Sequence, residues 1–68
     1  MDVPTQEELD SGIFPQLGST YISKNKMIWT VMKLFIRLTS KRRIPCITLN
    51  SNTGKIKHLS VELFNKGF

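Results

Sequence analysis

Residues 23–43 read SKNKMIWTVMKLFIRLTSKRR, and this stretch decides the fold because its densest apolar run is joined to seven of the chain's ten Lys and Arg residues. Nine of the twelve residues from 27 to 38 are apolar. Polar residues recur around that run at steps of four, three, four and four, which is the period of one helix face. These residues are Lys26, Thr30, Lys33, Arg37 and Lys41. The spacing predicts one long amphipathic helix over about residues 24–41.

The ends of this helix have plausible sequence signals. Ser23 can serve as the N-cap, and Pro45 disfavours helical geometry at Ile44. The cations at 41–43 would lie at the negative end of the helix, which favours positive charge. Part of the basic cluster therefore has a structural explanation. A helix with so wide an apolar arc must be covered by the rest of the chain, a second copy, a partner or a membrane surface.

The pattern changes after Pro45. Residues 46–49 are rich in strand formers, residues 50–54 form a turn cluster ending in Gly54, and apolar residues alternate from Leu59 to Leu63. We therefore predict a β-hairpin with strands at about 46–50 and 55–64. A short helix over 61–66, with Ser60 as N-cap and Gly67 after its end, is the alternative. Pro45 should occupy the first position of its strand or an edge.

The N-terminal segment is acidic. Thr5 and Glu8 have the spacing of a capping box, which predicts a short helix over 6–11 that Gly12 can end. A disordered acidic leader is the alternative. We divide the chain into an acidic arm at 1–22 and a single small α+β domain at 23–68. In that domain the long central helix packs on the C-terminal hairpin.

Composition limits the classes of function. The chain has 68 residues and net charge +5, with −4 on residues 1–23 and +9 on residues 24–68. A basic body favours polyanionic partners. The single cysteine, Cys46, allows no internal disulfide, and no secretory signal or run of about 20 apolar residues occurs, so we expect a cytoplasmic or nuclear location.

The residues offer little for catalysis. His58 is the only histidine, and the four glycines match no phosphate-binding fingerprint. We expect His58 to be exposed or paired across strands and Cys46 to be a small buried hydrophobe. The sequence therefore predicts a non-enzymatic regulatory or accessory protein with no cofactor and no metal site.

The sequence is compatible with two binding functions, of which we rank nucleic-acid binding first. In this function, a basic helix face extended by the hairpin contacts DNA or RNA phosphates without reading bases. Its predicted contact residues are Lys26, Lys33, Arg37, Lys41, Arg42, Arg43, Lys55 and Lys57.

The alternative is a protein-interaction module that binds a second copy or a partner protein through the apolar helix face. An acidic protein surface is a further polyanion that the basic residues would attract in place of nucleic acid. Its predicted anchors are Trp29, Met32, Phe35 and Leu38. A homodimer is the expected assembly. Contact with an anionic membrane surface ranks last, because the apolar arc is too wide for a helix lying in that interface.

Overall fold

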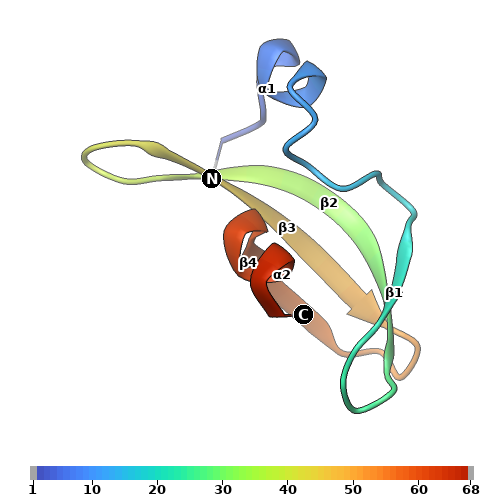
Figure 1. Cartoon of the computed structure of the whole chain (residues 1–68). Coiled ribbons are helices and arrows are strands. Elements are labelled where there is room, and N and C mark those ends of the chain that lie inside the picture. Colours follow the sequence, from blue (N-terminus) through green and yellow to red (C-terminus); the bar gives the residue numbers. More distant parts are fainter. Residues whose placement is uncertain (1, 68) are drawn as a thin grey trace.

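Four antiparallel strands form one sheet in the computed structural model, which describes residues 2–67 (Figure 1). Each strand pairs with the next along the chain, so the sheet order is β1-β2-β3-β4. The strands are β1 Thr20–Ile22, β2 Ile28–Leu38, β3 Arg43–Ser51 and β4 Ile56–Ser60. Two short helices flank them, α1 Gln6–Asp10 and α2 Val61–Gly67.

The predicted central helix over 24–41 is wrong. Its residues form a turn, the long strand β2 and the loop that leads into β3. The run Ile28-Trp29-Thr30-Val31 consists of β-branched and aromatic residues, which favour a pleated, half-buried strand over a helix. Pairing with β3 along nearly its whole length supplies the backbone hydrogen bonds that a helix would have made internally.

A β-bulge explains why β2 resembled a helix. The register with β3 shifts between Val31 and Lys33, leaving Met32 as the extra residue. Side chains alternate between the two faces of a strand, so steps of four residues stay on one face. The single step of three, from Thr30 to Lys33, spans the bulge. Because the bulge adds one unpaired residue, Thr30 and Lys33 lie on the same face of the strand although they are an odd number of residues apart. The spacing that predicted a helix face is therefore equally that of one face of a bulged strand.

Ser23 closes a turn and caps no helix. Its backbone N–H donates to the Met27 carbonyl at 2.9 Å, and its carbonyl accepts from the Lys26 N–H at 2.9 Å. The Ser23 hydroxyl also contacts the Asn25 side chain. Lys26 adopts a positive φ of 64°. These local contacts reverse the chain between β1 and β2.

The C-terminal hairpin is present, but its second strand is shorter than predicted. Residues 46–50 pair with residues 56–60, and the chain turns between them with Gly54 at φ 89°. The preferred strand over 55–64 is wrong beyond Ser60, where the alternative helix begins. The Ser60 hydroxyl accepts from the Leu63 N–H at 3.2 Å, which satisfies one backbone donor of the first turn of α2.

Pro45 is the third residue of β3 and lies where the sheet has narrowed. It pairs with Ile36 on β2, but it has no partner on β4, because the pairing of β3 with β4 begins only at Cys46. Ile36 exchanges both of its backbone hydrogen bonds with Asp2 at the outer edge of β2. The Ile36–Pro45 pair is therefore not hydrogen-bonded, and the missing donor of Pro45 points past the end of β4.

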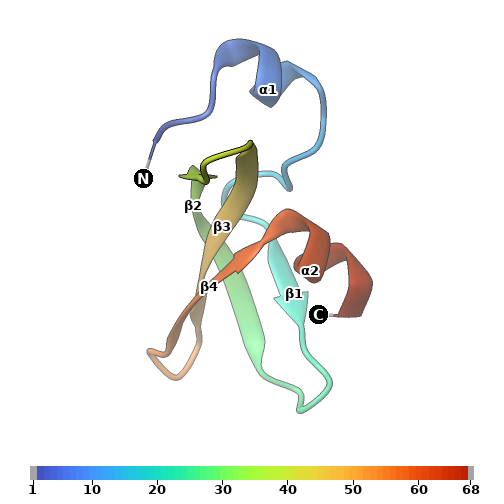
Figure 2. The ribbon, with the colours of Figure 1, turned by 90° about the vertical axis from the view of Figure 1, so that its left-hand side faces the viewer.

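One face of the sheet holds the main core. Val31 pairs with Leu49, and both lie with Trp29, Ile47 and Val61 in one buried cluster. Helix α2 lies against this face, with α1 above and away from it (Figure 2). The Phe64 ring of α2 meets Tyr21 of β1 edge to face, with ring centroids 4.7 Å apart. Burial of this apolar face is the main stabilising term of so small a chain.

The predicted N-terminal helix is confirmed, at residues 6–10. Thr5 accepts from the Glu8 N–H at 3.2 Å, and Glu8 accepts from the Thr5 N–H at 2.8 Å, so the capping box is complete. Residues 6–10 include no buried side chain. Neither α1 nor α2 is long and apolar enough to cross a membrane, and these are the helices of residues 2–67.

Candidate nucleic-acid interface

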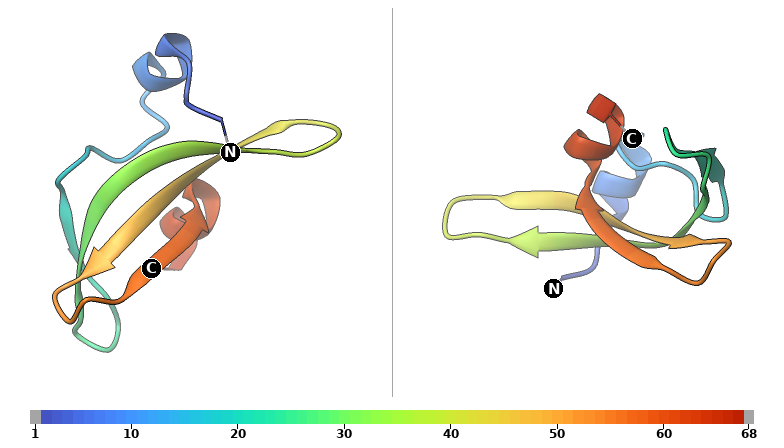
Figure 3. Two further views of the ribbon diagram at one scale, coloured as in Figure 1. Left: turned by 180° about the vertical axis from the view of Figure 1, so that it is seen from behind. Right: turned by 90° about the horizontal axis from the view of Figure 1, so that it is seen from below.

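The β2–β3 hairpin projects beyond the rest of the sheet (Figures 1 and 3). Pairing with β4 ends at Cys46, whereas β2 and β3 remain paired as far as Leu38 and Arg43. At its outer end the sheet is therefore a two-stranded ribbon closed by residues 39–42. A ribbon of two antiparallel strands is narrow enough to enter the major groove of a nucleic-acid duplex.

Thr39 shapes the loop at the tip of this ribbon. Its backbone N–H and its hydroxyl both donate to the Arg42 carbonyl at 3.0 Å. The same hydroxyl accepts from the N–H groups of Arg42 at 3.1 Å and Lys41 at 3.4 Å. A threonine side chain that bonds neighbouring backbone groups in this way stabilises a tight turn. The two loop cations are thus presented on an ordered turn.

Positive charge gathers at this ribbon. Four of the seven residues from 37 to 43 are Arg or Lys, and none is acidic. Arg37, Lys41 and Arg42 are exposed and have no salt bridge with any acid of residues 2–67. We call these three residues the tip cations. Since they are not helical, the helix-end explanation of this cluster no longer applies, and their charge stays available to a partner.

Arg43 is the exception among the cations of the ribbon. Its guanidinium donates to Asp2 at 2.7 Å and to the two carboxylate oxygens of Glu8 at 3.1 and 3.3 Å. Its Nη2 also reaches the Val3 carbonyl at 3.3 Å. Hydrogen bonds from Arg43 hold the pKa of both carboxyls below their usual values, and those carboxylates raise the pKa of Arg43.

The other predicted contact residues do not join the tip. Lys26 lies in the β1–β2 turn and Lys55 in the β3–β4 turn, at the opposite end of the sheet (Figure 1). Lys33 is exposed on β2 beside the bulge. Lys57 lies on β4 with its Nζ 5.9 Å from the centre of the Trp29 ring, a cation–π contact within the body. The predicted continuous basic stripe on a helix face does not exist.

The four predicted protein-interface anchors do not share a surface. Trp29 and Phe35 are both buried, with Trp29 in the main core and Phe35 paired with Cys46 on the opposite face of the sheet. Met32 and Leu38 are each 56% exposed. Strand alternation and the bulge therefore separate residues that a helix would have placed side by side.

His58 and Cys46 occupy the face opposite α2. The Nδ1 of His58 lies 2.9 Å from the Thr48 hydroxyl, a cross-strand hydrogen bond, and its ring meets Phe35 edge to face. Burial raises the pKa of the Cys46 thiol, while the nearby charge of Arg37 opposes this shift. Within residues 2–67, neither side chain is hydrogen-bonded to an acidic group that would orient it for nucleophilic catalysis. Across residues 2–67, no three His, Cys, Asp or Glu side chains gather where they could hold a metal ion.

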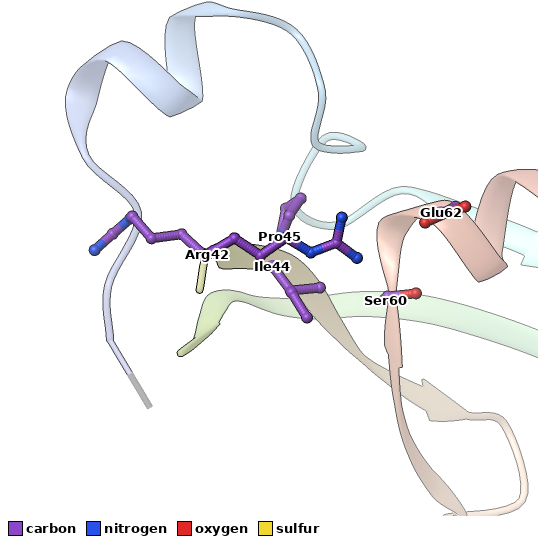
Figure 4. A pocket seen from close by; sticks show the side chains of 6 residues that line it. Arg42, Ile44, Pro45, Ser60 and Glu62 are labelled. Atoms are coloured by element: carbon purple, nitrogen blue, oxygen red, sulfur yellow. The ribbon is translucent and has the colours of Figure 1, made fainter. Parts of the chain in front are cut away.

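A pocket of about 130 Å³ opens at the base of the ribbon (Figure 4). Ile44 and Pro45 of β3 line it together with Ser60 at the end of β4 and Glu62 of α2, while Arg42 points away from these side chains. Ligand pockets for drug-sized molecules are larger, about 300–1,000 Å³. The pocket is therefore too small for an organic cofactor.

Comparison of the chain with protein-family models, curated proteins and solved structures finds no significant match.

Sequence reasoning missed one cation away from the ribbon and two features of the ribbon itself. It left out Lys24, an exposed cation in the β1–β2 turn, and the role of Thr39 in shaping the tip. It also missed the contact of Arg43 with Asp2 and Glu8, which spans 41 and 35 residues of sequence. The polar run Thr39-Ser40-Lys41-Arg42 between two apolar stretches was the available signal for a hairpin loop.

Proposed function

We propose that this protein is a non-enzymatic accessory protein that binds the phosphate backbone of nucleic acids through the tip of the β2–β3 hairpin. The observation that carries this proposal is the projecting ribbon whose tip cations, Arg37, Lys41 and Arg42, have no acidic partner among residues 2–67. Exposed Arg and Lys side chains bind phosphates by releasing condensed counterions, without reading sequence.

The distribution of charge supports a polyanion as the partner. Residues 24–68 carry a charge of +9 with Glu62 as their one acidic residue. Glu62 forms a salt bridge within α2, in which its Oε1 lies 3.3 Å from the Nζ of Lys66. Residues 24–68 therefore contain no second acidic side chain that could neutralise the ribbon. Their positive electrostatic potential favours association with an anionic chain.

The test is a salt titration of binding to a random-sequence duplex and to a random single strand. Replacing the tip cations together, as Arg37→Gln, Lys41→Gln and Arg42→Gln, should weaken duplex binding by about tenfold or more at low salt and reduce the slope of log K against log salt by about 2 to 3. Absence of micromolar binding by the wild-type protein at low salt would refute the proposal.

The matched control removes the same charge from the other end of the sheet. Lys24→Gln, Lys26→Gln and Lys55→Gln also lower the net charge by three, but they alter only the β1–β2 and β3–β4 turns. We expect a clearly smaller loss of affinity from this variant. Equal losses from both triple variants would mean that net charge, and not the ribbon, determines binding.

Self-association is the second candidate function, and one specific observation favours it. Ile22 and Ile28 form a cross-strand pair, and Ile56 lies on the same sheet face, opposite α2. They are 71%, 42% and 65% exposed, respectively. Several exposed isoleucines at one end of a sheet face make an apolar surface that a second copy of the chain can cover.

A further inference from the structure

We infer that Arg43 is a fourth phosphate-binding residue of the ribbon and that the first part of the acidic arm, residues 2–10, is an intramolecular competitor that occupies it. We refer to residues 2–10 below as the arm. This inference rests on the proposed function, because it concerns the regulation of the same ribbon. The arm would lower affinity for nucleic acid until a phosphate chain displaces its carboxylates.

The geometry of the contact is that of anion recognition. Arg43 uses Nε and Nη2 as a fork on the two oxygens of Glu8, and Nη1 donates to Asp2. Planar guanidinium groups bind phosphates through the same pairs of parallel donors. The two carboxylates therefore occupy the donors that a phosphate group would use.

The position of Arg43 joins it to the tip. It is the first residue of β3, pairs with Leu38 and directly follows Arg42 in the chain. Arg37 pairs with Ile44, the next position along the ribbon, so alternation places Arg37 and Arg43 on opposite faces. Release of Arg43 would give the ribbon cations on both faces, as a ribbon lying between two phosphate backbones requires.

The arm is weakly enough attached to be displaced. Helix α1 has five residues, none of them buried, and it makes no close backbone contacts with the described strands or with α2. So short a helix is marginal by itself. Besides the Arg43 contacts, the arm is tied to the sheet by two backbone hydrogen bonds between Asp2 and Ile36. The ion pairs of Arg43 are partly exposed, with 23% to 41% of each side chain accessible, so salt screens them.

The deciding experiment compares two double variants of equal charge. Asp2→Asn with Glu8→Gln removes the carboxylates that hold Arg43, and Gln at position 8 preserves the capping-box pattern. Glu7→Gln with Asp10→Asn removes two carboxylates of α1 that do not contact Arg43. Duplex affinity should rise by about three- to tenfold more in the first variant than in the second.

Adding Arg43→Gln to the first variant should abolish its extra gain, since the released group is then missing. In the wild-type protein, binding of the duplex should shift the backbone amide resonances of Val3 and of residues 5–10 in NMR spectra. Equal affinities of the two double variants, or unmoved amides of the arm on saturation with duplex, would overturn the inference while leaving the proposed function standing. Failure of every variant to bind would overturn both.

Discussion

At the scale of single residues, the Arg43 side chain makes four hydrogen bonds, and the three that go to carboxylates depend on pH. Asp2 and Glu8 are the acids that face its guanidinium, while Arg42 and Glu62 line the adjoining pocket. Hydrogen bonds from Arg43 lower the pKa of Asp2 and Glu8. The stabilisation by this contact is therefore complete above the unfolded carboxyl pKa of about 4, and it is lost as the pH falls through the lower folded values.

The corresponding prediction concerns Arg43→Gln. Without the guanidinium, the pKa of the Asp2 and Glu8 carboxyls should rise toward the values of an unfolded chain, and the arm should detach at neutral pH. An NMR titration of the side-chain carboxyl carbons in the wild type and the variant measures this shift. Identical titration midpoints for both proteins would show that Arg43 does not hold the arm.

At the scale of elements, tight turns decide where the strands end. Gly54 closes the β3–β4 hairpin at φ 89°, a left-handed conformation that side chains with a Cβ rarely adopt, although no atom lies within 4 Å of an added Cβ. The cost of a substitution there is therefore conformational and not steric. The β2–β3 loop instead uses the hydroxyl of Thr39, so the two hairpins are closed by different chemistry.

Gly54→Ala should lower the free energy of unfolding by about 1–2 kcal/mol. Gly67→Ala in α2 is the matched control, because that glycine also has open space around it but no positive φ. The control should be neutral or stabilising by up to about 1 kcal/mol, since alanine is the better helix former. Urea denaturation followed by circular dichroism measures both. Equal effects of the two substitutions would contradict the conformational explanation.

At the scale of the whole molecule, the two candidate functions use different regions and depend oppositely on salt. The ribbon and the isoleucine face lie toward opposite ends of a molecule whose longest dimension is 35 Å. Phosphate binding weakens as salt is added. Association of two copies, each with a net charge of +5, should strengthen because salt screens their repulsion.

We expect a weak dimer at high protein concentration that Ile28→Ser returns to the monomer. Leu63→Ser is the control, because Leu63 is 61% exposed but belongs to α2 and not to the isoleucine face. Sedimentation velocity over a range of protein and salt concentrations measures the association. A monomer under all conditions, or equal loss of dimer in both variants, would remove self-association through this face from consideration.

The elements that could be predicted from the sequence are those whose interactions join residues close along the chain. The α1 capping box links residues three positions apart, and the β3–β4 turn involves neighbouring residues, so local patterns were enough to predict both. The short helix after Ser60 remained an alternative, because both a strand and a helix can bury Val61. Docking of α2 on the sheet resolves that ambiguity.

The prediction of a central helix over residues 24–41 was wrong because the residue spacing there fits either a helix or a bulged strand until the pairing with β3 is known. A bulge at Met32 gave β2 the spacing of a helix face, and only the register with β3 separates the two interpretations. For the candidate site, the sequence identified the basic residues at 37–43 but not their arrangement, since a helix and a hairpin direct the same side chains differently.

The sequence by itself determined the charge imbalance, the capped acidic helix, the C-terminal turn and the cluster of cations before Pro45, because each depends on composition or on residues close along the chain. The tertiary structure decided that residues 28–38 form a strand, that Arg37, Lys41 and Arg42 project on a ribbon, and that Asp2 and Glu8 hold Arg43. Those outcomes depend on cross-strand pairing and on contacts up to 41 residues apart, which no local pattern of residues encodes.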